Sequence, residues 1–343
     1  MRLDFVDLTK NILTNLNFFK MKKLIVSVFA MALIFASCQN STEDFVFDTP
    51  NLIPSIAKQT SEAPCATMDV LEENVRSNPE IRERMNAIEN HTKEYLANKD
   101  KNQRKLVNGK IVIPVVFHVI YKSASENLSL ATLQGQVDAL NEDFNLQNPG
   151  RSTIPSAFAG VEANVGISFE IQQVIRVQNS KKRSWRPNDD MKQSSKGGSD
   201  VVNPQEYLNI WVVNSMPYRG GQILGYAQFP GGSWTTDGIV LASSFVGDSQ
   251  RTATHEVGHW LNLRHIWGDG GCGVDDFVAD TPESDAPNRG CPTYPDVSCG
   301  SADMTMNFMD YTSDSCLNLF TVGQKSRMDA VFASGGFRAS MAD

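Results

Sequence analysis

The chain has 343 residues, of which 41% are hydrophobic and 20% are charged, and its formal net charge is −8. This composition is typical of a globular protein and argues against a disordered chain or a protein with many membrane spans. The acidic balance also argues against a nucleic-acid-binding protein, which usually carries a basic patch.

The first 38 residues predict an export signal rather than a part of the fold. A short basic start, Met21-Lys22-Lys23, precedes an apolar run from Leu24 to Phe35, and two small residues then lead to Cys38. This order is typical of a bacterial secretory signal. Cys38 resembles the lipidated residue of a lipoprotein cleavage box, although Phe35 stands where a smaller aliphatic residue is usual. The alternative is a plain secretory signal with an incidental cysteine.

We therefore expect an exported bacterial protein. It is either a lipoprotein of the outer membrane or cell surface, attached through a lipid on Cys38, or a protein secreted once an N-terminal pro-segment has been removed. The apolar run is too short for a comfortable permanent membrane span, which needs about 20 residues. Residues 1–20 precede the signal, and we expect that they reflect a misplaced start codon or are removed with the signal.

Residues 39–108 predict a linker followed by a helical pro-segment. Residues 39–60 are polar and show no pattern, which suits a linker. Over residues 66–97, apolar side chains recur near helical spacing among many charged ones. A basic stretch follows at 98–109 and marks both a domain boundary and a candidate cleavage site.

Residues 109–343 predict a domain of mixed strands and helices. Segments rich in β-branched and aromatic residues predict strands at 110–121, 167–177, 207–213, 221–230 and 238–246. Glycines open the fourth of these strands and a proline ends it, which favours a place at the edge of a sheet. Ser129 is a candidate N-cap for a helix over residues 129–144. This mixture predicts an α+β or α/β fold with the chemistry at the end of the sheet.

A helix predicted over residues 251–261 carries two histidines, His255 and His259, four residues apart. Side chains at that spacing lie on one helix face, so both imidazoles can bind one zinc ion at about 2.0–2.1 Å. Glu256, next to the first histidine, is placed to hold and deprotonate a metal-bound water. The five-residue pattern alone is a weak signal, because common residues produce it by chance on many helices.

A third histidine, His265, follows six residues after the second. For it to reach the same ion, the helix must end and the chain must turn through a left-handed residue, where glycine is easiest and asparagine is the best-tolerated alternative. Asn262 stands between the two histidines. This spacing is that of metzincin metallopeptidases, with the usual glycine replaced. The two other histidines, His91 and His118, are interpreted as structural.

Some forty residues downstream, the segment 306–311 (MNFMDY) places methionine among aromatic residues. Metzincins carry a methionine-containing turn near the zinc motif. A methionine in such a setting usually belongs to a core, but the long zinc motif favours the functional interpretation. We expect Met309 to form the floor of the metal site without binding the ion, and Tyr311 to swing toward the metal or the oxyanion.

These motifs together resemble the pappalysin family of metzincins, in particular its small prokaryotic members. The resemblance covers roughly residues 65–337 and rests on the segments 255–265, 278–282, 307–311 and 321–328. It implies an α+β, metzincin-like zincin fold with a twisted mixed β-sheet and an active-site helix. An upper subdomain would run to about residue 265. An irregular lower subdomain, residues 266–343, would end in a helix.

Four cysteines cluster after the histidine motif, and in an oxidising compartment they fit two disulfides with three possible pairings. The family resemblance implies the pairs Cys272–Cys299 and Cys291–Cys316. It also implies a structural calcium ion in a loop that contains Asp275, Asp276, Asp280 and Thr281. The alternative is that these loop residues are simply solvated.

Cys65 is left over and precedes the predicted helical pro-segment. A thiolate is a strong zinc ligand, so a pro-segment cysteine can take the fourth position on the ion and displace the catalytic water. Latent members of the family carry a cysteine in such a position, which implies a cysteine switch. The alternatives are a disulfide between chains and an inert buried thiol.

The expected activity is hydrolysis of internal peptide bonds in protein or peptide substrates. His255, His259 and His265 would hold zinc, Glu256 would act as general base, and Tyr311 would be a second oxyanion donor. An extended substrate would pair with the edge strand near residues 224–229. The pro-segment would be the enzyme's own inhibitor.

Specificity depends on the pocket that receives the residue after the cut. Small prokaryotic pappalysins favour basic residues there and use an acidic side chain in that pocket. Asp314 is the only acidic residue in the segment 312–315, just before Cys316, and is our candidate for this role.

Two other functions remain open at this stage. A surface-anchored zinc-binding lipoprotein without turnover is disfavoured by the intact Glu256, because a purely structural zinc site is closed by a fourth protein ligand. Metal-dependent hydrolysis of a non-peptide substrate is disfavoured by the third histidine together with the methionine turn.

Overall fold

The computed structural model describes residues 64–98 and 111–342. The predicted export signal, the predicted linker at 39–60 and the basic stretch from residue 99 to 109, with its candidate cleavage site, lie outside the described residues. Its helices are α1 (Thr67–Ser77), α2 (Glu80–Ala97), α3 (Leu130–Phe144), α4 (Thr252–Trp260) and α5 (Val322–Phe332). Its strands are β1 (Ile111–Tyr121), β2 (Ile167–Gln178), β3 (Leu208–Val213), β4 (Met216–Tyr218), β5 (Gly221–Ile223), β6 (Gly225–Ala227), β7 (Ile239–Ala242), β8 (Val297–Ser298) and β9 (Ser301–Ala302). None of the helices in these ranges is long and apolar enough to cross a membrane.

A five-stranded mixed sheet in the order β2-β1-β3-β7-β6 forms the centre of the fold. Strands β1, β2, β3 and β7 pair in parallel, and β6 pairs antiparallel to β7 at one edge. Parallel strands need long crossover connections, and α3 supplies one between β1 and β2. The predicted α+β fold with a mixed sheet is confirmed.

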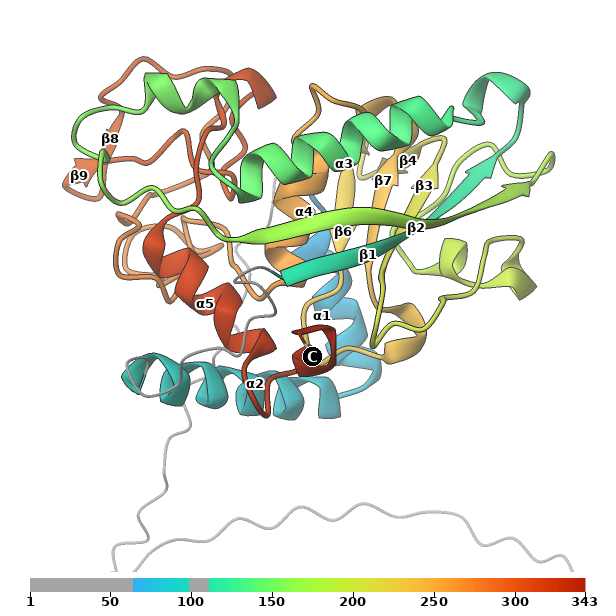
Figure 1. Cartoon of the computed structure of the whole chain (residues 1–343), viewed down its shortest axis with the longest axis horizontal. Coiled ribbons are helices and arrows are strands. Elements are labelled where there is room, and N and C mark those ends of the chain that lie inside the picture. The colour runs from blue at the N-terminus through green and yellow to red at the C-terminus, as the bar shows by residue number, and fades with distance from the viewer. Residues whose placement is uncertain (1–63, 99–110, 343) are drawn as a thin grey trace, which may run out of the picture. The chain divides into compact units, whose positions relative to one another are not determined.

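One face of the sheet packs on α3 and α4 to form the main core. Alternate residues of β1, such as Val115 and Phe117, lie in this core with Leu140 of α3 and Val257 of α4. Helix α3 begins as predicted, because the Ser129 side chain accepts a hydrogen bond from the backbone N–H of Thr132. Figure 1 shows α3 lying along the sheet, with α4 behind it. The main core therefore holds α4 rigidly beside the edge strand β6.

Two of the predicted elements are divided in the structure. The segment predicted as one helix over residues 66–97 forms α1 and α2, separated at Asn78 and Pro79, since proline disfavours the helical conformation of the residue before it. The segment predicted as one strand over 221–230 forms β5, which pairs with β4 in a separate hairpin, and β6, which joins the sheet.

Few regular elements follow α4 until the final helix. This lower part contains the short β8–β9 hairpin and two disulfides, which join Cys272 to Cys299 and Cys291 to Cys316. These are the pairings that the family resemblance implies. Helix α5 then begins at a capping box formed by Thr321 and Gln324. Figure 1 shows α2 running below α5, and residues of the two helices contact one another.

Candidate active site

Three histidine side chains converge at the C-terminal end of α4. The Nε2 atoms of His255 and His265 are 3.3 Å apart, and that of His259 lies 3.1 Å from each of them. Nitrogens that bind one tetrahedral zinc ion at about 2.0–2.1 Å stand about 3.3 Å from each other. The donor atoms are thus spaced as a single zinc ion requires.

The turn after α4 brings the third histidine into place. Asn262 has a φ of 74°, in the left-handed region that the sequence predicts for this position. The backbone N–H of Leu263 donates to the carbonyl of Gly258 at 2.9 Å, which closes the end of the helix. The chain then reverses toward the face of α4 that carries His255 and His259.

The second ring nitrogen of each histidine is also held. His255 Nδ1 lies 2.8 Å from the carbonyl oxygen of Phe308, and His259 Nδ1 lies 2.8 Å from that of Leu263. His265 Nδ1 lies 2.6 Å from Asp269 Oδ1. Such partners fix the ring orientation and the tautomer that leaves Nε2 free to bind a metal. Sequence reasoning missed Asp269, although its spacing of four residues from His265 was a usable signal.

Burial keeps His255 and His259 neutral, as metal binding requires. Burial, and secondly the neighbouring His265, lower the pKa of His255 to about 3. The pKa of His259 is lowered well below its ordinary value for the same two reasons. Neutral imidazoles offer their lone pairs to a cation.

Glu256 lies beside the histidines and is fully buried. Burial raises the pKa of this carboxyl to about 8, and hydrogen bonds from Thr67 and Cys65 oppose that rise. Thr67 Oγ1 donates to Glu256 Oε2 at 2.9 Å, and Cys65 Sγ donates to the same oxygen at 3.5 Å. A Cβ at Gly225 would lie 2.9 Å from Glu256 Cγ, so only glycine lets the edge strand pass this close.

Cys65 joins the histidine cluster from the other end of the chain. Its Sγ and one nitrogen from each of the three histidines all lie within 4.8 Å of one another, and no other such group occurs within residues 64–98 and 111–342. Burial, followed by the Glu256 charge, raises the pKa of its thiol well above the ordinary value. Three imidazole nitrogens and one cysteine sulfur are a set of donor types that zinc accepts.

The residues around Cys65 pair with the edge strand β6. Leu224 N donates to the carbonyl of Pro64 at 2.8 Å, and Ala66 N donates to that of Gly225 at 3.2 Å. Cys65 and Gly225 form a parallel bridge. Thr67 also accepts a hydrogen bond from the backbone N–H of Ala227 at 2.8 Å. Nothing in the sequence marked Thr67, because its role appears only when the chain places it against Glu256.

The methionine turn packs against α4, next to the helix face that carries the histidines. Met309 is fully buried, and a Cβ at Gly258 would come within 2.4 Å of its Sδ, so the glycine in α4 lets the turn pack against the helix. The Tyr311 ring lies 4.9 Å from that of His265 and 5.6 Å from that of His255, measured between centroids. Burial, followed by Cys65, raises the pKa of Tyr311 well above its ordinary value.

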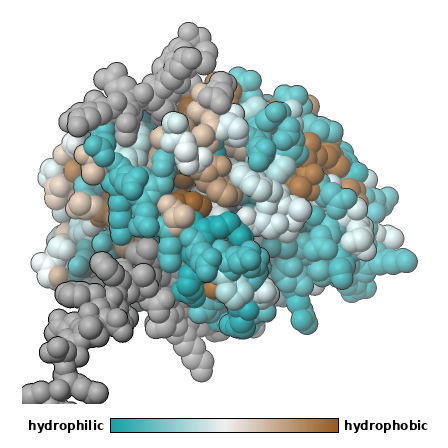
Figure 2. All heavy atoms as spheres, turned by 90° about the horizontal axis from the view of Figure 1, so that it is seen from below, coloured by the Kyte–Doolittle hydropathy of each residue, from teal (hydrophilic) through white to brown (hydrophobic). Residues whose placement is uncertain are grey.

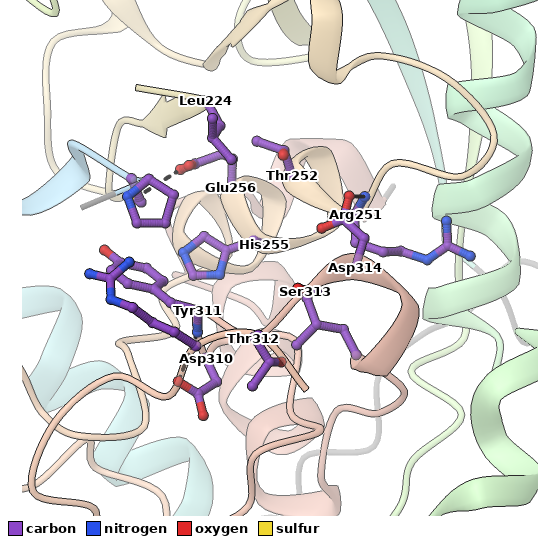
Figure 3. Close-up of a pocket in the computed structure, with 15 residues that line it drawn as sticks. Leu224, Arg251, Thr252, His255, Glu256, Asp310, Tyr311, Thr312, Ser313 and Asp314 are labelled. Atoms are coloured by element: carbon purple, nitrogen blue, oxygen red, sulfur yellow. Dashed lines mark hydrogen bonds between the residues drawn. The ribbon is translucent and has the colours of Figure 1, made fainter. Parts of the chain in front are cut away.

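A pocket opens beside this cluster, and Figure 3 shows Glu256, His255 and Tyr311 facing it. Cys65 and Leu224 also line it. Asp314 also lines the pocket, and Figure 3 shows it beside Arg251.

The surroundings of Asp314 hold one of its oxygens in place. Asp314 Oδ2 accepts a hydrogen bond from the backbone N–H of Arg251 at 3.0 Å. The Arg251 side chain turns instead to Asp143, with a distance of 3.0 Å between Nε and Oδ2.

The calcium candidates accept hydrogen bonds from the protein itself. Asp280 accepts from the Thr321 hydroxyl at 2.6 Å and from the backbone N–H of Gly323 at 2.8 Å, at the start of α5. Asp276 accepts from the Thr281 hydroxyl at 2.8 Å, and Asp275 from the backbone N–H of Phe277 at 2.7 Å. Each carboxylate thus has a structural partner of its own.

The two remaining histidines lie apart from the cluster. His118 is buried, with its ring nitrogens 2.8 Å from Ser199 Oγ and 2.8 Å from Asn209 Oδ1. His91 Nε2 lies 3.1 Å from the carbonyl oxygen of Ala330. These contacts agree with the interpretation of both residues as structural.

Comparison with known proteins places these features in a family. A peptidase family model described as pregnancy-associated plasma protein-A matches residues 192–333. Extracellular metalloprotease 1 of Coccidioides posadasii is 35% identical over 250 residues, which cover 67% of this chain and 79% of that protein. An extracellular metalloprotease of Pyricularia oryzae is 34% identical over 247 residues, with coverage of 67% and 77%.

Solved structures give the same result for the fold. Mature mirolysin of Tannerella forsythia, in complex with a cleaved peptide, is 40% identical with a TM-score of 0.65, covering 68% of this chain and 96% of that chain. A promirolysin mutant from the same organism is 36% identical with a TM-score of 0.69, covering 82% of this chain and 97% of that chain. The likeness to the promirolysin chain covers more of this chain than the likeness to mature mirolysin.

Proposed function

This chain is a metallopeptidase of the pappalysin family, and from this premise we propose that it is an exported zinc endopeptidase made as a latent zymogen. The observation that carries the proposal is the convergence of three histidine Nε2 atoms, the Glu256 carboxyl and the Cys65 thiol on one point. The extracellular relatives support export. The domain boundaries, at residues 38 and 108 and near residue 265, stay predictions.

His255, His259 and His265 would hold zinc, which when bound supplies a Lewis acid for the scissile carbonyl. Glu256 would take the proton of the attacking water and pass it to the leaving amine. Tyr311 would donate to the oxyanion from its place beside the histidine rings.

Latency would rest on the segment around Cys65. The Cys65 thiol, which lies beside the three histidines, would take the fourth position on the ion, and the Thr67 hydroxyl donates a hydrogen bond to the carboxyl of the proposed general base. The same segment uses the backbone groups of Leu224 and Gly225 on the edge strand. When this segment leaves, the metal site, Glu256 and the edge strand would all become accessible to substrate at once.

An extended substrate would bind to the groups that the pro-segment now uses. The N–H groups of Leu224 and Ala227 and the carbonyl of Gly225 can pair with a peptide backbone, which makes binding tolerant of sequence. Selectivity would come from the pocket that contains Asp314, and we propose a preference for arginine or lysine after the cut. A peptide library that shows no basic preference would remove this part of the proposal.

We further propose that the pro-segment carries the membrane anchor, a lipid on Cys38, and that a cut near Arg104 or Lys105 both activates and releases the enzyme. If active enzyme isolated from cells still carried Cys38, this proposal would be ruled out. A structural calcium ion near Asp276 also stays a prediction, which a metal analysis of the purified protein would check.

The test of the catalytic assignment is casein cleavage by recombinant 39–343, with Glu256→Gln beside it and zinc measured in both. After removal of the pro-segment, the variant should retain zinc and lose activity by roughly 10²–10⁴-fold, since glutamine keeps the shape of the side chain but takes no proton. If both proteins bound zinc and neither cleaved casein, a zinc-binding lipoprotein without turnover would be the better hypothesis.

A further inference from the structure

Glu89, a buried carboxylate on α2, pairs with a buried arginine on α5. The two oxygens of Glu89 lie 2.8 and 2.6 Å from Nη1 and Nη2 of Arg327, so the pair is bidentate. Burial opposes ionisation of Glu89, but the hydrogen bonds and charge of Arg327 outweigh it, and the pKa of Glu89 lies below its ordinary value. The carboxylate therefore stays charged within the interface.

Arg327 also contacts the turn that carries the histidines. Its Nε donates to the carbonyl of Asn262 at 3.0 Å. Arg264 lies close enough that burial and the Arg327 charge lower the pKa of Arg264 to about 10. The two buried arginines repel each other, so the space between α5 and the turn after α4 favours an anion. Asp269, Glu89 and Asp276 all act on Arg264 with their negative charge, and of the three Glu89 is the one that comes from α2.

Other contacts of α2 are also independent of the metal. Ile81 and Met85 pack in a small apolar cluster with Phe229, just beyond the edge strand β6. Arg84 Nε donates to the carbonyl of Gly231 at 2.7 Å, and His91 Nε2 lies 3.1 Å from that of Ala330. The outer side of α2 carries exposed charged residues, and Figure 2 shows large hydrophilic areas on the underside of the molecule.

We propose that Arg327 and its surroundings form a second docking site for the pro-segment. This site binds the Glu89 carboxylate of the pro-segment, and it does not depend on zinc. The inference rests on the proposed function only in treating residues 64–98 as a pro-segment. A cut in the linker, as proposed above, would then activate and free the enzyme only once the severed segment has also dissociated from this second site. The cysteine would block the metal, while Glu89 would supply much of the affinity.

The test uses the full chain 39–343 with Cys65→Ala and Glu256→Gln, which remove the sulfur ligand and prevent self-digestion. A recognition site for a specific protease is inserted within residues 99–110, the chain is cut there, and the dissociation constant of the two fragments is measured by dilution and gel filtration. The fragments should co-elute at micromolar concentration. Adding Glu89→Gln should weaken their association by about 100-fold or more, since it leaves a buried charge without its partner.

Glu94→Gln is the matched control, because it makes the same change at an exposed position of α2. It should change the dissociation constant by less than about twofold. A Glu89→Gln chain whose fragments hold together as tightly as those of the control would overturn the proposal. Fragments that separate at once even with Glu89 intact would overturn it as well.

Folding is checked on the uncut chains by hydrogen exchange. Glu89→Gln should raise exchange in residues 80–97 and leave residues 111–121 unchanged. Should that variant not fold, Glu89→Asp, which keeps the charge but shortens the side chain, should still weaken the association, and equality with the parent would contradict us. No activity is measured and Cys65 is absent, so the result does not depend on the cysteine switch or on catalysis.

Discussion

One hydroxyl, on Thr67, joins the segment around Cys65 both to Glu256 and to the edge strand β6. It donates to Glu256 Oε2 at 2.9 Å and accepts from Ala227 N at 2.8 Å. Its side chain is fully buried, so neither partner could turn to water while the segment stays in place. A buried polar group left without its partner costs about 1–3 kcal/mol. Thr67 should therefore contribute to latency alongside Cys65.

Thr67→Val keeps the shape of the side chain and removes the hydroxyl. We expect the uncut zymogen to open more readily, with residual casein cleavage about 10-fold or more above that of the parent, because both partners regain water only in the open state. Thr67→Ser, which retains the hydroxyl, should stay close to the parent. Equal latency of the valine and serine variants would show that the hydroxyl contact has no inhibitory role.

At the scale of elements, the C-terminal segment holds the end of the active-site helix. Arg338 makes two hydrogen bonds with Asp237, at 2.9 and 3.0 Å, and its guanidinium lies 3.6 Å from the centre of the Trp260 ring. The indole N–H of Trp260 donates to the same aspartate at 2.9 Å. Trp260 is the last residue of α4, so this group joins the helix, the loop before β7 and the C-terminal segment.

Asp237→Asn should destabilise the protein by roughly 3–5 kcal/mol, since Arg338 would remain buried with no countercharge at this contact. Denaturant unfolding followed by circular dichroism measures the change. Asp248→Asn makes the same substitution at an exposed position and should stay within about 0.5 kcal/mol of the parent. A small effect of Asp237→Asn would mean that Trp260 packing alone secures the helix end.

At the scale of the whole molecule, the lower part of the domain depends on cross-links. Between α4 and α5 the regular elements are a two-stranded hairpin and a three-residue 3-10 helix at Asp314–Cys316. Two disulfides close loops there with sequence separations of 27 and 25 residues. The second of these loops contains the methionine turn and the pocket residue Asp314. The Cys291–Cys316 disulfide should therefore help to order the pocket wall as well as stabilise the fold.

Replacing both Cys291 and Cys316 by serine should lower the free energy of unfolding by about 3 kcal/mol, because the unfolded chain regains the freedom that the closed loop denies it. Thermal unfolding measures this loss, and we expect a lower Tm. Retained casein cleavage at low temperature would show that the pocket wall still forms. An unchanged Tm would mean that packing, and not the cross-link, orders this part of the domain.

The sequence by itself predicted three histidines as metal ligands, because the spacing that brings them together is local in the chain. His255 and His259 lie on one helix face by the helical period, and Asn262 supplies the left-handed turn that returns His265. The β-branched runs likewise predicted the central strands and the mixed fold. Local patterns failed at element boundaries, where Pro79 divides one predicted helix and the sheet edge divides one predicted strand.

Only the tertiary structure decided what surrounds those residues. Cys65 and Glu256 are 191 residues apart, and Glu89 and Arg327 are 238 residues apart, yet each pair shares a hydrogen bond. No periodicity or spacing encodes such pairs, since they depend on where β6 and α5 stand once the core has packed. Thr67 and Glu89 are ordinary residues in an ordinary helical pattern, and they acquire a role only because folding buries them against partners from the other end of the chain.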